Sequence, residues 1–407
     1  LSGGAGDNTI DASAYTGSVT IDGGAGADTL TGGSGADSLT GGSGADSLVG
    51  GAGNDSLGGG DGIDTLDGGD GTDHISHSED ADQTLTDTSL GGDTLANIES
   101  AALTGGDSAN TIDASGFSGT VTIDGGAGAD TLTGSSGDDV MYGGGGDDVL
   151  TGSGGSDNID GGGDSDKVIQ SVDADQTLTD NTLTGEGTDT LSGIEDAELT
   201  GGAGDNAIDA GGFSGSVTID GGAGADTLTG GAGDDSIDGG SGTDQVVQSV
   251  DADQTLSDAQ LTGAGTDVLI NVESAQLTGG AGDNTIDASG FAAGSVTIDG
   301  GAGADTLTGS AASDVIDGGA GADSLVGGAG ADTLTGGAGD DVLDGGADSD
   351  VVAQTVDADQ TLSVDLGTDN AVGGEGDAAD TTQLTGDGTD AITNIESAQL
   401  TGGAGDN

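Results

Sequence analysis

An aspartate recurs at every ninth residue through four stretches of this 407-residue chain, each time behind a cluster of glycines. The pattern is G-G-x-G-x-D-x-U-x, with U apolar, and its first copies read GGAGADTLT, GGSGADSLT and GGSGADSLV. Twenty copies occur, six from Gly23, five from Gly125, three from Gly221 and six from Gly300. Glycines permit positive φ and a close approach of carbonyl oxygens. Ca²⁺ takes six to eight oxygens from carbonyls and carboxylates, so the six residues GGxGxD are suited to bind it.

The last three residues of each nonapeptide predict a short strand with its middle residue pointing inward. Two nonapeptides would complete one coil, giving two parallel sheets with a row of calcium ions along each edge. The chain has 93 Gly and only 1% aromatic residues, so the interior is a thin line of aliphatic side chains. In the first block this line is Leu30, Leu39, Leu48, Leu57, Leu66 and Ile75.

The charge of the chain restricts its partners. Seventy-five acidic residues face a single base, Lys167, for a net charge of −74. Acidic, Gly-rich chains are usually disordered, so this one either stays disordered or is neutralised by cations. Binding to nucleic acid or to an anionic membrane needs Lys and Arg and is therefore not expected. No apolar stretch is long enough to span a bilayer. Because calcium is plentiful outside cells, we expect an extracellular, cell-surface protein.

A longer module surrounds each block of nonapeptides. It opens with GGAGDNTIDAS and closes with DADQTLTD and NIESAxLTGG, with small variations. The spacing from its opening Ile to its closing Gln differs between modules only by multiples of nine residues, which indicates a regular solenoid. The chain starts and stops at one phase of the module and is interpreted as a window of a longer array. The predicted modules are 1–102 (nonapeptides 23–76), 103–198 (125–169), 199–276 (221–247) and 277–399 (300–353), with 400–407 starting another.

The nonapeptides resemble the RTX, or hemolysin-type, calcium-binding repeat, whose pattern is a known repeat signature. The resemblance implies an all-β, right-handed parallel β-roll and β-helix solenoid, which we expect to form an elongated rod. It also implies type I secretion, folding triggered by calcium, and on the order of 12 to 20 bound Ca²⁺ ions. The implied ligands are the sixth-position aspartates Asp28, Asp37, Asp46, Asp55, Asp64, Asp73, Asp130, Asp139, Asp148, Asp157, Asp166, Asp226, Asp235, Asp244, Asp305, Asp314, Asp323, Asp332, Asp341 and Asp350.

Several positions leave alternatives open. The repeats that carry Asp157, Asp314 and Asp350 depart from the glycine pattern, so ions there are in question, and end turns of each block are candidates for half-sites. Opening turns that carry Asn in place of Asp are either weak ligands or plain turns. Segments between blocks read as wider β-helix coils without calcium. The two histidines, His74 and His77, are expected on the surface rather than as a transition-metal pair.

No Ser-His-Asp or Cys-His arrangement repeats, and we expect no enzyme. The first hypothesis is a structural protein of a bacterial surface layer, sheath or extracellular filament. Its partner would be another copy of itself, end to end or laterally, and a cell-surface polysaccharide is a second partner class. The alternative is the repeat or spacer region of a large type I-secreted RTX adhesin or exoenzyme. A calcium store is the third hypothesis.

Overall fold

The computed structural model describes residues 1–356, 361–365, 381–385 and 388–402. The chain divides into two compact units, 1–172 with 176–199, and 173–175 with 200–407. In both units the described elements are all β-strands, and most of them pair in parallel.

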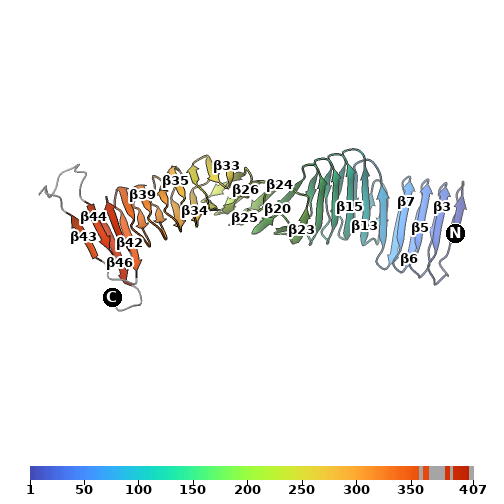
Figure 1. Cartoon of the computed structure of the whole chain (residues 1–407). Helices are drawn as coiled ribbons and strands as arrows, with labels where there is room; N and C mark the ends of the chain where they lie inside the picture. The colour runs from blue at the N-terminus through green and yellow to red at the C-terminus, as the bar shows by residue number, and fades with distance from the viewer. Residues whose placement is uncertain (357–360, 366–380, 386–387, 403–407) are drawn as a thin grey trace. The chain divides into compact units, whose positions relative to one another are not determined.

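The first unit begins with alternating strands of two layers (Figure 1). The strands in chain order are β1 (Ser2–Gly4), β2 (Thr9–Asp11), β3 (Thr20–Ala25), β4 (Thr29–Thr31), β5 (Ser38–Ser43), β6 (Ser47–Ala52), β7 (Ser56–Asp61), β8 (Thr65–Asp70), β9 (His74–Ser78), β10 (Gln83–Thr86), β11 (Ser89–Leu90), β12 (Asp93–Ala96), β13 (Ser100–Gly106), β14 (Thr111–Gly116), β15 (Thr120–Ala127), β16 (Thr131–Thr133), β17 (Val140–Gly145), β18 (Val149–Thr151), β19 (Asn158–Gly163), β20 (Lys167–Ser171), β21 (Gln176–Thr179), β22 (Thr182–Thr184) and β23 (Thr188–Ser192).

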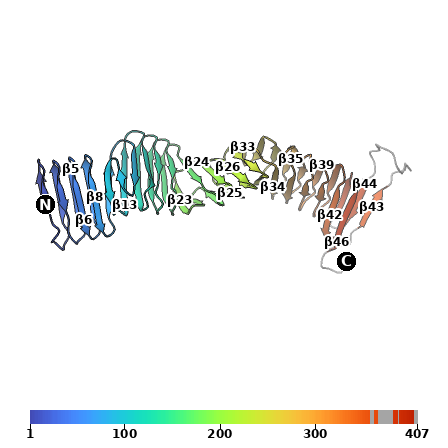
Figure 2. The ribbon, with the colours of Figure 1, turned by 180° about the vertical axis from the view of Figure 1, so that it is seen from behind.

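The second unit has the same construction, and the opposite view shows its strands from behind (Figure 2). After β24 (Asp196–Gly202), which spans the boundary between the units, the strands are β25 (Ala207–Gly212), β26 (Ser216–Gly224), β27 (Thr227–Thr229), β28 (Ser236–Asp238), β29 (Ser241–Gly242), β30 (Gln245–Ser249), β31 (Gln254–Ser257), β32 (Gln260–Gly263), β33 (Gly265–Ile270), β34 (Ser274–Gly280), β35 (Thr285–Gly290), β36 (Val296–Gly301), β37 (Thr306–Thr308), β38 (Val315–Asp317), β39 (Ser324–Ala329), β40 (Thr333–Thr335), β41 (Val342–Ala347), β42 (Val351–Val356), β43 (Thr361–Asp365), β44 (Thr381–Thr385), β45 (Thr389–Thr393) and β46 (Ser397–Gly402).

One coil of the solenoid takes two nonapeptides, as predicted. Strand β3 pairs in parallel with β5, and Ile21 lies opposite Leu39, eighteen residues on. Strand β4 pairs with β6 in the same way, with Leu30 opposite Leu48. Each nonapeptide therefore carries the chain from one layer to the other, and the fold is the predicted β-roll solenoid.

The core is the predicted aliphatic line. The six inward residues of the first block are at most 2% exposed, and burial of each such side chain stabilises the fold by about 1.5–3 kcal/mol. The wider coils are filled by Phe117, Phe213 and Phe291, each 1% exposed, whereas Tyr15 at the same module position is 56% exposed. The three phenylalanines are thus packing residues and leave no ring face for stacking on a sugar.

The closing segments differ from the predicted parallel coils. In the first module β10 pairs antiparallel with β11, and β11 pairs antiparallel with β12. Antiparallel meanders recur as β21–β22–β23, β31–β32–β33 and β43–β44–β45. The prediction was wrong because a period-2 pattern of apolar residues is the same for parallel and antiparallel strands. Only a tight turn between two strands, such as that at Asp87–Thr88, makes them form an antiparallel hairpin.

The number of nonapeptides in a block decides the layer that receives the next module. In the first unit a block of six separates the opening strands β2 and β14, and both belong to one layer. In the second unit a block of three separates β25 and β35, and these belong to opposite layers. An even block preserves the layer and an odd block exchanges it, because every nonapeptide crosses once.

Candidate metal-binding turns

All twenty sixth-position aspartates are buried at the edges of the two layers, none more than 3% exposed. Each lies directly before a strand or at its first residues, where the glycine turn delivers it. In every one, Oδ1 accepts a hydrogen bond from a backbone N–H one coil earlier, at 2.6–2.9 Å. The carboxylates therefore form continuous rows, two per module, in which each turn is joined to the next turn on the same edge.

The second carboxylate oxygen distinguishes most of these aspartates. In sixteen of them Oδ2 is buried and has no hydrogen-bond partner among the described residues. A buried, unpartnered carboxylate oxygen costs several kcal/mol unless a cation or proton satisfies it. The sixteen are Asp28, Asp46, Asp55, Asp64, Asp73, Asp130, Asp148, Asp157, Asp166, Asp226, Asp244, Asp305, Asp323, Asp332, Asp341 and Asp350.

A backbone carbonyl converges on the same space as this oxygen. A Cβ placed on Gly125, the first residue of its nonapeptide, would lie 2.5 Å from Asp130 Oδ2 and 2.7 Å from the carbonyl oxygen of Gly143 in the next turn. On Gly300 the corresponding distances are 2.7 Å to Asp305 Oδ2 and 2.7 Å to the Gly318 oxygen. Only glycine leaves this space open, so the first glycine of the repeat keeps free a cradle lined by oxygens of two coils.

The ligand set of these cradles fits calcium. Among the described residues, no three His, Asp or Glu side chains gather into a group that could hold a metal by side chains alone. A cation would therefore take most of its ligands from the backbone, and carbonyl-rich oxygen sites suit Ca²⁺ better than metals that prefer nitrogen or sulfur. The glycines at positions two and four make this possible, as Gly24 and Gly26 do with φ of 100° and 116°.

The first aspartate turn of each second row has another conformation. In these turns Oδ2 accepts a hydrogen bond from the N–H of position two, as in Gly33 to Asp37 at 2.5 Å and Gly231 to Asp235 at 2.7 Å. Asp139 and Asp314 are held in the same way by Ser135 and Ser310. Position two has no positive φ there, which is why serine is accepted. These four carboxylates have protein donors for both oxygens and need a cation less than the other sixteen.

The irregular nonapeptides divide between the two conformations. Asp314 belongs to the self-bonded class just described. The turns of Asp157 and Asp350 keep the open conformation, because Ser153 adopts φ 68° and Asp348 adopts φ 81° in place of glycine. Both aspartates retain an unpartnered Oδ2, as the regular ones do. Sequence alone assigned all three to one doubtful group.

The opening turns with asparagine are also self-bonded. The N–H of Gly4 donates to Asn8 Oδ1 at 2.6 Å, and Asn206 and Asn284 accept from Gly202 and Gly280 at 2.9 Å. A neutral amide oxygen that already accepts a hydrogen bond is a weak calcium ligand. This geometry favours the interpretation of these residues as structural first turns of their rows.

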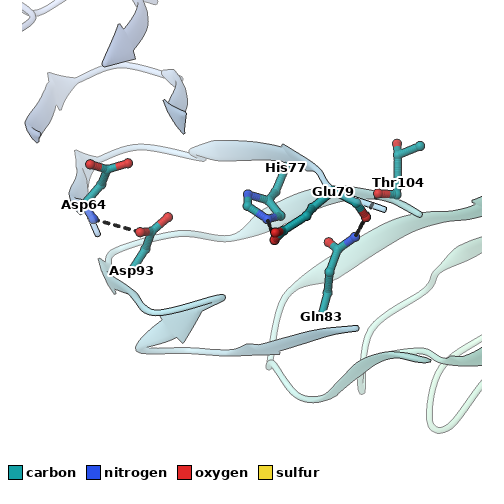
Figure 3. A network of polar contacts seen from close by, with 6 residues as sticks. All are labelled: Asp64, His77, Glu79, Gln83, Asp93 and Thr104. Atoms are coloured by element: carbon teal, nitrogen blue, oxygen red, sulfur yellow. Dashed lines mark hydrogen bonds and ion pairs between the residues drawn. The ribbon is translucent and has the colours of Figure 1, made fainter. Parts of the chain in front are cut away.

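Eight further acids end the rows, and the sequence analysis missed all of them. Four are aspartates of degenerate turns; Asp64 N–H, for example, donates to Asp93 Oδ1 at 2.8 Å (Figure 3). The other four are glutamates of the closing segment, such as Glu99, whose Oε2 accepts from Asp73 N–H at 2.8 Å. The aspartates are Asp93, Asp189, Asp267 and Asp390, and the glutamates are Glu99, Glu195, Glu273 and Glu396. The signal was the recurrence of G-T-D (G-G-D in the first module) and of N-I-E, with its variants G-I-E and N-V-E, at fixed module positions.

The two histidines have different polar neighbours. His74 Nδ1 lies 3.0 Å from Ser100 Oγ. His77 Nε2 lies 3.4 Å from Glu79 Oε2 (Figure 3). Both lie on β9 and are half-buried, rather than exposed on the surface as predicted. In the same view Gln83 donates to the carbonyls of Glu79 and Thr104. His77 and Asp93, the aspartate that ends one row of the first module, line the same small pocket.

Burial raises the pKa of most of the row aspartates. It raises the pKa of Asp157 to about 7 and those of Asp166, Asp323 and Asp332 to about 6, with repulsion from neighbouring carboxylates adding to the effect. Backbone N–H donors oppose the shift without cancelling it. The rows thus favour bound positive charge, either as protons or as metal ions, over free carboxylates.

Comparison with known proteins agrees with this chemistry. The family model of the RTX calcium-binding nonapeptide repeat matches residues 1–14, 22–57, 49–83, 115–150, 133–168, 218–246, 276–291, 293–325 and 317–352, together more than half of the chain. No curated protein matches the chain. In the part of the chain that the structure describes, no helix has the length and apolarity needed to cross a membrane.

Proposed function

Because the chain belongs to the family of RTX calcium-binding nonapeptide repeat proteins, we propose that it is a secreted structural protein of a bacterial surface layer, sheath or extracellular filament. It is a calcium-binding repeat protein, and proteins with these repeats are typically secreted. The proposal gives it no catalytic role. Its place would be outside the cell, at the surface, where calcium is available to fold it.

The observation that carries the calcium part of the proposal is the set of sixteen buried, unpartnered Oδ2 atoms. The chain has one Lys or Arg against 75 acids, so the protein cannot neutralise these oxygens itself. Divalent ions between successive turns would bind carboxylates and carbonyls together and remove the repulsion along each row. Folding and calcium binding would then be one process, because the cradles form only when adjacent coils stack.

The structural part of the proposal is supported by the regularity of the coils. Every strand of the described chain belongs to the parallel layers or to the meanders that close them. Outward strand positions carry mostly Thr, Ser and Asp, which recur at each coil and present a regular polar surface. Such a surface suits lateral contact with another copy of the chain, whereas end-to-end contact would use the unpaired strand edges of a terminal coil. A cell-surface polysaccharide is the other partner that this polar surface would suit.

Two measurements test the proposal. Circular dichroism of the full chain is expected to show disorder in chelator and a β-rich spectrum in 10 mM CaCl₂, with MgCl₂ a poor substitute. Electron microscopy of the calcium-loaded chain is expected to show regular fibres or lattices. Isolated particles would overturn the assembly role and favour a spacer in a type I-secreted adhesin or exoenzyme. Many loose calcium sites without a folding transition would indicate a calcium store.

A further inference from the structure

The last nonapeptide in one row of every module has an unusual neighbour. The aspartates of these turns are Asp73, Asp166, Asp244 and Asp350, each 0% exposed and each without a partner for Oδ2 among the described residues. No nonapeptide follows them on that edge. If the rows needed a further nonapeptide to complete a site, these four oxygens would belong to half-sites.

The closing segment supplies the missing carbonyl. Elsewhere in a row, the first glycine of the nonapeptide one coil later places its carbonyl oxygen in the cradle, as Gly143 does for Asp130. At the row ends, the nearest carbonyls to a Cβ placed on Gly68, Gly161, Gly239 and Gly345 are those of Asn97, Gly193, Asn271 and Asn394. The matching distances to the aspartate Oδ2 atoms are 2.5, 2.6, 2.8 and 2.6 Å.

A shared backbone conformation aims these four carbonyls. Asn97, Gly193, Asn271 and Asn394 have φ of 53°, 59°, 50° and 50°. This left-handed region is open to glycine and, among other residues, best tolerated by asparagine. Asn and Gly thus interchange at this position for a physical reason, and the carbonyl keeps one place in all four modules.

The glutamate two residues later supplies the missing carboxylate. The Oε2 atoms of Glu99, Glu195, Glu273 and Glu396 accept from the N–H groups of the last aspartates at 2.8, 3.0, 2.9 and 2.7 Å. Within a row the next aspartate makes this contact with Oδ1. The chain has only eight glutamates, and four of them are at this position. Repulsion from Glu99 contributes to the raised pKa of Asp73, so the two carboxylates lie near each other.

The other row of each module ends differently. There Asp64, Asp157, Asp235 and Asp341 precede the terminal aspartates. The three atoms nearest to a Cβ on Gly59 all belong to Asp64, and those nearest to a Cβ on Gly336 all belong to Asp341. Beside Gly152 and Gly230 the third atom is an Ile Cδ1. The incoming carbonyl is therefore a property of the glutamate-ended rows and not of row ends in general.

We propose that the Asn-Ile-Glu segment, with its variants Gly-Ile-Glu and Asn-Val-Glu, closes one calcium row of every module as a complete terminal site. The carbonyl of the left-handed residue and the glutamate carboxylate take the places of a further nonapeptide. The ion would join the nonapeptide block to the wider coils that follow it. This inference rests on the calcium binding of the proposed function, and it assigns ligands outside the nonapeptide.

A pair of charge-matched variants of the full chain tests the terminal sites. E99Q/E273Q removes two carboxylates from the sites, while glutamine keeps an oxygen to accept from the aspartate N–H. The control E79Q/E198Q removes two carboxylates that are 57% and 44% exposed. Calcium bound per chain is measured by equilibrium dialysis at 0.1–10 mM free Ca²⁺. We expect two sites to weaken at least tenfold in E99Q/E273Q and none in the control.

Equal binding by the two variants would overturn the inference while leaving the proposed function intact. No binding by the unaltered chain would instead overturn the proposed function itself. A second pair guards against a folding defect. Asn271→Gly keeps the left-handed backbone and is expected to keep every ion, whereas Asn271→Ala disfavours φ 50° and is expected to lose one. Retention of that ion by Asn271→Ala would also contradict the proposal.

Discussion

The cradle beside the first glycine of each repeat can be filled by a single methyl group. Gly125 has an ordinary φ, so Gly125→Ala brings no backbone strain, yet its Cβ would lie 2.5 Å from Asp130 Oδ2 and 2.7 Å from the Gly143 oxygen. Ordinary contacts of this kind begin near 3.4 Å. Both oxygens must therefore move by about 0.8 Å, which breaks the calcium site. Gly145→Ala, in the same block, is the matched control because no atom lies within 4 Å of its Cβ.

The magnitude follows from mass action. A saturated site adds RT ln(1 + [Ca²⁺]/Kd) to the free energy of unfolding, about 1.4 kcal/mol for each tenfold rise in calcium. Loss of one ion in Gly125→Ala should therefore widen its stability deficit against Gly145→Ala by about 1.4 kcal/mol between 1 and 10 mM free Ca²⁺. A clash that left the ion in place would give a deficit that does not change with calcium.

Urea unfolding followed by circular dichroism at 1, 3 and 10 mM free Ca²⁺ measures this difference. Equilibrium dialysis should show one ion fewer in Gly125→Ala than in Gly145→Ala. If the two variants bind equal numbers of ions and their deficit is independent of calcium, the position-one cradle is not the metal site and the reasoning from its geometry is refuted.

Three other predictions follow from the turns. In chelator, the raised pKa values of Asp157, Asp166, Asp323 and Asp332 mean that the folded form binds more protons than the unfolded form between about pH 4 and 7. The stability of the calcium-free fold should therefore rise as the pH falls from 8 to 5.5. A circular dichroism titration that shows less β-structure at pH 5.5 than at pH 8 would contradict this. Asp148→Asn should stabilise the calcium-free fold and destabilise the calcium-loaded fold, each by about 1–2 kcal/mol, because the amide can donate to the Gly161 carbonyl but cannot bind Ca²⁺ strongly. Thermal melts with and without calcium measure the two effects, and a change of the same sign in both conditions would count against the prediction. Ser153→Gly should stabilise the folded chain by about 0.5–1 kcal/mol, because φ is 68° at this position. Ser135→Gly should destabilise it, because Ser135 Oγ donates to the Gly119 carbonyl at 2.6 Å and bonds Asp139 at 2.8 Å. If the denaturant midpoints of the two variants shift in the same direction, the assignment of two turn conformations is wrong.

The regular part of the fold was predictable because its period is set locally. Six small or polar residues form a turn and three form a strand, so the eighteen-residue register and the buried positions of Leu30 and Leu48 follow from the repeat alone. The twenty buried aspartates follow in the same way. Their ligand role stays a prediction from the repeat, the orphaned oxygens and the cradles.

What the sequence did not reveal depends on neighbours in space. Asp37 and Asp55 are equivalent in their repeats, but only Asp37 follows the segment around Tyr15 on its edge and bonds its own turn. Glu99 was overlooked because it stands in an irregular spacing from Asp73, although the left-handed turn at Asn97 restores the distance. Antiparallel pairing of β10 with β11 was hidden because alternation of apolar residues does not encode strand direction.

The alternation of layers gives the length of a block a second meaning. Gain or loss of a single nonapeptide would place every following strand in the opposite sheet, so that side chains on one flank of the solenoid would lie on the other flank. Gain or loss of a pair would lengthen the stack and leave each flank as it was. Changes in repeat number would therefore be of two kinds. A change of eighteen residues extends the stack and keeps each flank, whereas a change of nine residues exchanges the flanks of all following coils and would disrupt any contact between copies made through one flank.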